Sequence, residues 1–222
     1  MNPALIRLLH LASPTLPVGA YTYSQGLEWA VETGVIENEA GALLWIGDSL
    51  EFGIARFEAV YLAHMLAAWQ ERDMARLAEL NAEFVASRES AELRAETLQM
   101  GYSLARLLND LAEFPAQAFS AFSVPSFPLA WSCAAAEWAV PNMDAVAGYL
   151  WAWAENQVMA AVKAVPLGQT AGQRMLIELG GRLPHLAEAA VSAPIEETHN
   201  YLPAFAIASS LHESQYTRLF RS

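Results

Sequence analysis

The chain has 222 residues, of which 55% are hydrophobic and 16% are charged, whereas a typical soluble domain has about 45–50% apolar and about 25% charged residues. Its formal net charge is −12, and no cluster of Lys and Arg occurs. A nucleic-acid partner is therefore not expected, because binding to a phosphate backbone requires such a cluster. The single cysteine, Cys133, excludes an internal disulfide and a multi-thiolate zinc site.

Residues 114–136 form the longest uncharged stretch, and they are numerous enough to span a bilayer, which takes about 20 residues. Pro115, Pro125 and Pro128 interrupt this stretch, so we expect no membrane span. The first residues lack the basic and then long apolar pattern of a secretory signal, which predicts a cytoplasmic protein. The apolar surplus must then be buried in the core or against other proteins, and from it we expect a homodimer.

The first apolar run of the chain ends at a turn. Pro17 and Gly19 cannot continue a helix, since proline lacks the amide donor and glycine favours turns. Thr22 and Gln25 fit a capping box, in which two side chains satisfy free amides at a helix start. A helix is therefore predicted over residues 22–32.

Three further helices follow from the spacing of apolar residues. Apolar side chains recur at steps of three, four and seven between Leu43 and Met65, which predicts a long helix. Asp73 is predicted to cap the next helix, which ends near Ala86. Residues 87–111 are predicted to form the third helix.

The helix predicted over residues 87–111 has a charged first half and an apolar second half. We interpret the charged positions as a solvated face. Gly101 costs about 1 kcal/mol relative to alanine in a helix, so it predicts a close crossing with another helix. The charged residues of this face are Arg88, Glu89, Glu92 and Glu96.

The second half of the chain is also predicted to be helical. Residues 116–138 read as one or two helices broken near the prolines at 125–128. Asn142 is predicted to cap a helix over residues 145–162, whose apolar residues on all sides place it in the middle of the bundle. A last helix is expected to break at Gly180, Gly181 and Pro184, and the chain is expected to be irregular beyond Pro194.

No run of alternating apolar and polar residues suggests a sheet. The sequence therefore predicts an all-α protein, a single-domain bundle of roughly seven to ten helices. We assign residues 1–193 to this helical domain and residues 194–222 to a C-terminal tail that binds a partner.

No constellation of residues matches a reaction class. The five histidines lack the spacing of a helical metal motif, and neither a phosphate loop nor a Gly-x-Ser-x-Gly elbow occurs. We therefore expect no catalytic residue, no metal site and no cofactor. One alternative stays open: a helical enzyme with a buried apolar pocket around Trp151 and Trp153, which would be active without partners.

The positively charged residues Lys163, Arg218 and Arg221 can each be interpreted in two ways. Lys163 is the only lysine, and it either interacts with a helix C-terminus or meets an acidic group of a partner. Arg218 and Arg221 bracket Leu219 and Phe220 in a tail that is either disordered or an interface anchor, because arginine and aromatic residues are favoured anchors.

Three separated stretches resemble the UreF family of urease accessory proteins. They are LPVGAYTYSQGLEWAVE at residues 16–32, VKAVPLGQTAGQ at residues 162–173 and HESQYTRLFRS at residues 212–222. Residues 87–96 look like a fourth block, whereas residues 114–140 match poorly. None of these blocks is a catalytic motif, but together they extend from one end of the chain to the other.

The resemblance implies an all-helical accessory protein for nickel insertion into urease. In this family the protein binds UreD (also called UreH), and the complex recruits the GTPase UreG before it engages apo-urease. An effect on GTP hydrolysis, for which Arg174, Arg218 and Arg221 are candidates, and a passage for nickel have been proposed for the family.

From the resemblance we expect residues 17–28 and 163–173 to form one docking face for UreG, and the tail to anchor on UreD. The partner-binding residues expected are Pro17, Gly19, Tyr21, Tyr23, Ser24, Glu28, Lys163, Gln169, Gln173, Arg174, Tyr216, Arg218, Leu219, Phe220 and Arg221.

Overall fold

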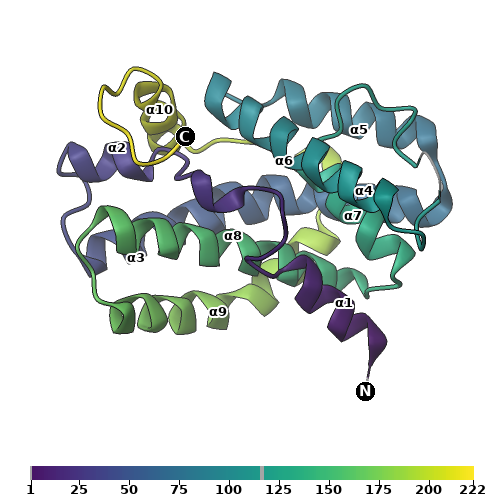
Figure 1. The fold of residues 1–222 in the computed structure, drawn as a ribbon, viewed down its shortest axis with the longest axis horizontal. Helices are drawn as coiled ribbons and strands as arrows, with labels where there is room; N and C mark the ends of the chain where they lie inside the picture. Colours follow the sequence, from purple (N-terminus) through teal and green to yellow (C-terminus); the bar gives the residue numbers. More distant parts are fainter. Residues whose placement is uncertain (1, 116–117) are drawn as a thin grey trace.

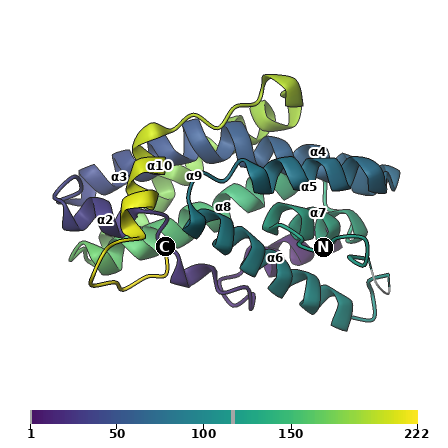
Figure 2. The same ribbon diagram turned by 90° about the horizontal axis from the view of Figure 1, so that it is seen from above.

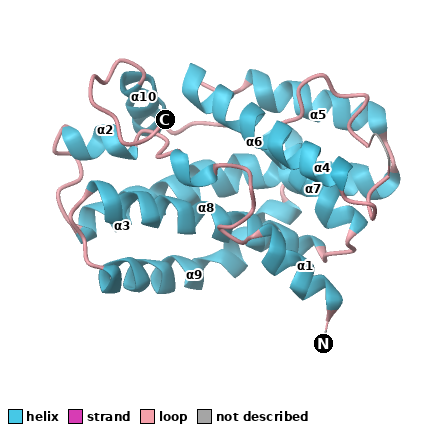
Figure 3. Ribbon diagram, viewed as in Figure 1, coloured by secondary structure: helices cyan, strands magenta, loops and turns pink. Residues whose placement is uncertain are grey.

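The computed structural model describes residues 2–115 and 118–222, and within these ranges all regular structure is helical (Figures 1 and 3). This confirms the all-α prediction. The α-helices are α1 (Pro3–Leu11), α2 (Leu27–Glu32), α3 (Glu39–Asp48), α4 (Ala59–Glu71), α5 (Met74–Ala86), α6 (Ala91–Asp110), α7 (Phe127–Glu137), α8 (Asn142–Ala164), α9 (Gln169–Ser192) and α10 (Pro203–His212). Short 3₁₀ turns η1 (Ala20–Thr22) and η3 (Ile195–Glu197) and a π-helical segment η2 (Ser49–Glu58) complete the fold.

Helix α8 lies in the middle of the bundle, as its apolar residues predict. It packs against α9 along its length and also contacts α1, α2, α3 and α4. On the other side of α4, α5 and α7 complete the core. The view from above (Figure 2) shows α10 and the following chain lying near α2, at the end of the molecule opposite the N-terminus.

The long helix predicted between Leu43 and Met65 is confirmed as part of a continuous helical run from α3 through η2 to α4. Its predicted stripe is buried at Leu50, Ile54 and Phe57. In the π-helical segment, Glu58 is also buried, at the point where α4 begins. Such wide turns often occur at functional sites.

Other predicted features are confirmed at α5 and α6. The Asp73 carboxylate accepts a hydrogen bond from the Arg76 amide at 2.9 Å, and α5 ends at Ala86. A side chain at Gly101 would collide with the main chain of Pro125 and Ser126, so glycine is required where α6 crosses the start of α7. No helix in the described ranges is long and apolar enough to cross a membrane.

Two predicted helix starts are wrong. Helix α2 begins at Leu27 rather than Thr22, and the Thr22 hydroxyl donates to the Gly19 carbonyl instead of capping a helix. Asn142 is the first residue of α8 instead of its cap, and its side chain accepts a hydrogen bond from Gln70. The first difference involves a local hydrogen bond within the turn, and the second involves a contact with Gln70 of α4.

The predicted break near Pro184 is also wrong, because α9 continues through it to Ser192. Packing against α8 stabilises the helix: Gly180 lies against the Trp151 ring, and Leu179 and Leu183 are buried. Beyond Pro194, where an irregular chain is predicted, α10 forms with a proline in its first turn, a favoured position.

The prolines near residue 125 separate irregular chain from a single helix. Helix α7 begins at Phe127, and the Ser126 side chain accepts a hydrogen bond from the Leu129 amide at 3.4 Å. Turns at residues 118–121 and bends at residues 123–124 lie where part of a first helix was expected. Residues 116–117 of that expected helix lie outside the described ranges.

Candidate functional site

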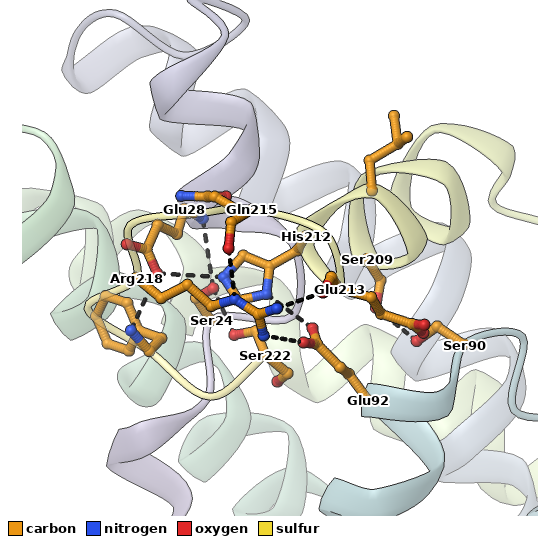
Figure 4. Close-up of polar contacts among 12 residues, drawn as sticks. Ser24, Glu28, Ser90, Glu92, Ser209, His212, Glu213, Gln215, Arg218 and Ser222 are labelled. Carbon is orange, nitrogen blue, oxygen red and sulfur yellow. Dashed lines mark hydrogen bonds and ion pairs between the residues drawn. The ribbon is translucent and has the colours of Figure 1, made fainter.

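The last residues of the chain fold back onto the segment before α2 (Figure 4). We call residues 212–222 the C-terminal clasp. The Ser222 carbonyl oxygen accepts hydrogen bonds from the amides of Ser24 at 2.5 Å and Gln25 at 3.0 Å, and from the Ser24 hydroxyl at 2.6 Å. The Arg221 amide donates to the Thr22 carbonyl at 2.7 Å. Two of the sequence blocks singled out above are thus in direct contact.

The Glu28 side chain accepts hydrogen bonds from the main chain of the clasp. Its two carboxylate oxygens accept hydrogen bonds from the main-chain amides of Leu219 at 2.6 Å and Phe220 at 3.0 Å. Glu28 is buried, so these amides replace the water that an exposed carboxylate would have. Glu28 is therefore an internal support of the clasp in this conformation.

His212 links two acidic side chains from different helices. Its Nε2 lies 3.2 Å from Glu28 of α2, and its Nδ1 lies 2.7 Å from Glu92 of α6. The ring is fully buried between the two carboxylates. Glu92 also pairs with Arg218 at 2.6 Å, and Arg218 donates to the Glu213 carbonyl (Figure 4). The clasp is thus fixed to α2 and α6 by a connected set of hydrogen bonds and the Arg218–Glu92 ion pair.

A second buried acid, Glu96, lies one turn further along α6. It accepts hydrogen bonds from the Gln25 side chain at 2.8 Å and the Ser222 hydroxyl at 3.2 Å. Burial raises the pKa of Glu96 to about 8, because the interior disfavours the charged form. The Gln25 side chain also accepts from the Trp153 indole at 2.7 Å, which connects this network to α8.

The prediction that the charged residues at the start of α6 form a solvated face is therefore wrong for most of them. Glu96 is buried, Glu92 pairs with the clasp, and Arg88 forms a buried ion pair with Glu58 at 2.5 Å. Only Glu89 is exposed. One signal was present in the sequence: Glu96 falls on the same helical stripe as the apolar residues at 93, 100 and 104.

Lys163 reaches the same region from the last turn of α8. Its Nζ lies 5.8 Å from the centroid of the Phe220 ring, within the range of a cation–π contact. The start of α9 is different: Gln169 and Gln173 are exposed, and Arg174 pairs with Glu39 of α3 at 2.6 Å. Among the described residues, no hydrogen bond or ion pair joins these three to the clasp.

The expected partner-binding residues divide into a buried and an exposed group. Buried are Tyr23, Ser24, Glu28 and Phe220, which hold the clasp or lie beneath it. The exposed fraction is 64% for Tyr21, 71% for Leu219 and 101% for Tyr216. Pro17, Arg218 and Arg221 are exposed as well, and Gly19 is half-buried.

The described residues include no group of three or more His, Cys, Asp and Glu that could hold a metal ion. Cys133 is buried, and burial raises the pKa of its thiol to about 12, so it is not a ready nucleophile. A cavity of about 280 Å³ does lie beside Trp153, between residues 11–21, α6 and α8. Trp151 instead packs against Gly180 of α9.

Comparison with known proteins places these features in a family. A model of the UreF family matches residues 36–180. The chain is 61% identical over 231 aligned positions to the urease accessory protein UreF of Azoarcus sp. (strain BH72), with 100% of this chain and 99% of that protein covered.

Two further relatives agree. The urease accessory protein UreF of Dechloromonas aromatica (strain RCB) is 57% identical, with 98% of this chain and 97% of that protein covered. That of Methylobacillus flagellatus is 47% identical, with 99% of this chain and 98% of that protein covered. The match to the Azoarcus protein covers the whole chain, including residues 22–28 and 212–222, and the chain belongs to the UreF family of urease accessory proteins.

Proposed function

We propose that this chain is a non-catalytic adaptor in urease maturation, which binds UreD (UreH) and recruits the GTPase UreG for nickel insertion into apo-urease. The observation that carries this proposal is the clasp, which joins residues 22–28, the start of α6 and Lys163 into one surface. Adaptors bind through such preformed surfaces, since little ordering is then required on association.

The exposed side chains on this surface supply the proposed contacts. Tyr21, Tyr216 and Leu219 are large and exposed, while the backbone beneath them is fixed by buried hydrogen bonds. Exposed aromatic side chains on a rigid support are favoured interface anchors. We assign residues 17–28 and 163–173 to UreG, and the C-terminal region, residues 194–222, to UreD.

Copurification tests the assignment. Tagged UreG and UreD are expressed with wild-type chain or with Tyr21→Ala, Tyr216→Ala or Tyr102→Ala. We expect Tyr21→Ala to reduce capture by UreG and Tyr216→Ala to reduce capture by UreD, each by about tenfold or more, as for an interface anchor. Tyr102, which is exposed on α6 outside the clasp, serves as the control. Equal capture of all four proteins would reject the surface assignment.

We further propose that an arginine of this chain changes the rate of GTP hydrolysis by UreG. Arg174 and Arg218 are already paired with Glu39 and Glu92, so an arginine acting in trans would first have to leave its partner. Single-turnover hydrolysis by UreG, measured in the complex with Arg174→Ala, Arg218→Ala or Arg221→Ala, decides this. An unchanged rate in all three variants excludes it.

We also propose that the adaptor works as a homodimer. Leu44 on α3 and Ile177 on α9 are 65% and 77% exposed, and α3 packs against α9. Large apolar side chains on adjacent helices favour association with a second copy. Sedimentation equilibrium of the wild type and Ile177→Glu tests this: a wild-type monomer, or a dimer unaffected by the substitution, contradicts the proposed surface.

A further inference from the structure

The Glu96 carboxyl group lies at the contact between the helical bundle and the clasp. Its Oε1 accepts a hydrogen bond from the Gln25 side-chain amide at 2.8 Å, and its Oε2 lies 3.2 Å from the Ser222 hydroxyl. Glu96 and Ser222 are both buried, at 6% and 1% exposure. One oxygen of this carboxyl group is therefore bonded within the bundle, and the other is bonded to the clasp.

The hydrogen bonds determine which oxygen of Glu96 can carry a proton. The Trp153 indole can only donate, and it donates to Gln25 Oε1 at 2.7 Å. Gln25 therefore directs its amide nitrogen at Glu96 Oε1, which has to be an unprotonated acceptor. A proton on Glu96 is thus located on Oε2, where the Ser222 hydroxyl can accept a hydrogen bond from it.

The surroundings of Glu96 favour this protonated form. Arg88 is paired with Glu58 at 2.5 Å, and the Tyr149 hydroxyl donates to the other Glu58 oxygen at 2.7 Å. In the described parts of the chain, no ion pair joins Glu96 to a cation. A buried carboxylate without a paired cation is disfavoured, and the pKa of about 8 for Glu96 agrees with this.

Other titratable and charged groups surround Glu96, and each of them can add to a dependence on pH. An experiment therefore has to separate Glu96 from the rest. The groups of the clasp and its ion pairs are Glu28, Glu92, His212, Arg218 and Arg221. Those on the bundle side of Glu96 are Tyr23, Glu58, Arg88, Tyr149, Glu155 and Lys163.

We propose that attachment of the clasp is linked to a proton on Glu96 Oε2: the protonated acid stabilises the attached clasp, and loss of the proton weakens it. In the attached state a charged Oε2 stays buried against Ser222, whereas in the detached state water can hydrate the carboxylate. Ionisation is thus more favourable in the detached state, so a rise in pH shifts the clasp towards detachment.

This inference concerns regulation of the surface that carries Tyr216 and Leu219. Its consequence for UreD rests on the proposed function, because that surface is assigned to this partner. Its test uses this chain alone and measures no partner. The inference and the proposed function can therefore fail independently.

Amide hydrogen exchange of the full chain, measured by NMR from pH 5 to 8 and corrected for the intrinsic exchange rate at each pH, reports detachment. The reporters are the amides of Leu219 and Phe220, which donate to Glu28, and of Arg221, which donates to the Thr22 carbonyl. We expect their protection to fall by about tenfold or more over this range, at no more than about tenfold per pH unit, since one carboxyl group releases one proton.

Amides in the middle of the bundle show whether the opening is local. Val158 and Ala161 are buried in α8, so their amides exchange only through larger openings. We expect them to stay more strongly protected than the clasp amides at every pH. Equal protection of the two sets would mean that the clasp does not detach by itself, which contradicts the proposal.

Two substitutions assign the proton. Glu96→Gln can keep an oxygen towards Gln25 and a hydrogen-bond donor towards Ser222, as in the neutral acid, and it should reduce the slope of clasp protection against pH to less than half of the wild-type slope. Glu89→Gln, at an exposed position before α6, should leave the slope unchanged. The acids and the histidine of the clasp are intact in both variants, so any slope that remains in Glu96→Gln belongs to them.

The wild type gives a second measurement that does not depend on the folding of Glu96→Gln. Carbon-13 NMR of the Glu96 carboxyl carbon should show titration well above the ordinary pKa of 4.5. Three further results overturn the proposal: clasp protection that does not fall between pH 5 and 8, a slope in Glu96→Gln of at least half the wild-type slope, or a titration midpoint of Glu96 below about pH 6.

Discussion

Two segments of this chain share a local sequence pattern and differ in structure. Residues 17–25 and 166–173 both contain Pro-x-Gly followed by Thr-x-x-Gln. Their first turns are alike, because the residue after proline donates its amide to the carbonyl before proline, at 2.8 Å for Val18 and 2.5 Å for Leu167. They diverge at the glycine: φ is +81° at Gly19 and −74° at Gly168.

The difference continues beyond the glycine. Gly168 leads directly into α9, whereas Gly19 leads into a 3₁₀ turn and then to Gln25 and Gly26, both with positive φ. What distinguishes the two segments is the chain packed against them. The clasp and α10 cover residues 22–28, while Gln169 and Gln173 are exposed. The two segments also differ by one residue between the glycine and the threonine, and only the first lies under the clasp.

Alanine substitutions of the glycines should give the largest difference in stability between the two segments. A Cβ at Gly26 would lie 2.6 Å from the Ser209 amide nitrogen, and φ is +82°. We expect Gly26→Ala to lower the free energy of unfolding by about 2–5 kcal/mol, from left-handed strain and displacement of α10. Urea denaturation followed by far-UV circular dichroism measures this loss.

Two controls use the other glycines. Gly19→Ala retains only the strain, since no atom lies within 4 Å of its Cβ, and should cost about 1–2 kcal/mol. Gly168→Ala has neither strain nor a close contact and should change stability by less than about 0.5 kcal/mol. Equal losses at the three positions would contradict the role of α10.

The two glutamines give the next largest difference. Gln25→Ala leaves Glu96 Oε1 and the Trp153 indole without their buried partners, at a cost of about 2–4 kcal/mol. Gln173→Ala, at an exposed position, should change stability by less than about 0.5 kcal/mol. Paired urea denaturation curves test this, and similar losses would mean that the buried network is not stabilising.

The buried acid should make stability depend on pH. Because the pKa of Glu96 is raised from its ordinary 4.5 to about 8, the folded state binds a proton that the unfolded state releases. The stabilisation is complete below about pH 4.5 and is lost as the pH rises to about 8, with a slope of at most about 1.4 kcal/mol per pH unit. Unfolding free energies measured from pH 4 to 9 test this.

Glu96→Gln should remove this slope, since its amide resembles the neutral acid, and the variant should be more stable than the wild type above pH 8. Glu32→Gln, at an exposed position near the end of α2, is the control and should leave the slope unchanged. A wild-type slope that persists in Glu96→Gln would assign the effect to another group.

The exposed ion pair at the start of α9 should give the smallest effect. The hydrogen bond from Arg174 lowers the pKa of Glu39, so this pair stabilises the fold above the ordinary pKa and loses its effect as the pH falls. Arg174→Ala should raise the pKa of Glu39 toward its ordinary value, as seen by NMR titration. The urea midpoint at pH 7 should be unchanged, because exposed pairs contribute little; a loss as large as that of Gln25→Ala would contradict this.

Periodicity of apolar residues predicted most of the fold from the sequence. The stripe that includes Leu50 and Phe57, the cap at Asp73 and the close approach at Gly101 depend on local spacing or on one residue type. The wrong prediction at Pro184 has a tertiary cause. Continuation of α9 through Pro184 depends on packing against α8, which local propensity does not encode.

The candidate site was predictable in its segments but not in its geometry. Resemblance indicated residues 16–32 and 212–222, yet sequence spacing could not reveal that their main chains bond to each other. Glu92 and Glu96 were missed because acidic residues on a helix are usually solvated. Their partners, His212 and Gln25, come from distant parts of the chain.

One carboxyl group has contacts on two sides. Glu96 accepts a hydrogen bond from Ser222 of the clasp and also lines the cavity beside Trp153. Detachment of the chain end would remove the hydrogen bond from the Ser222 hydroxyl and change the surroundings of this buried acid. Thermodynamic reciprocity then requires that protonation of Glu96 and attachment of the chain end change each other's equilibrium by the same factor.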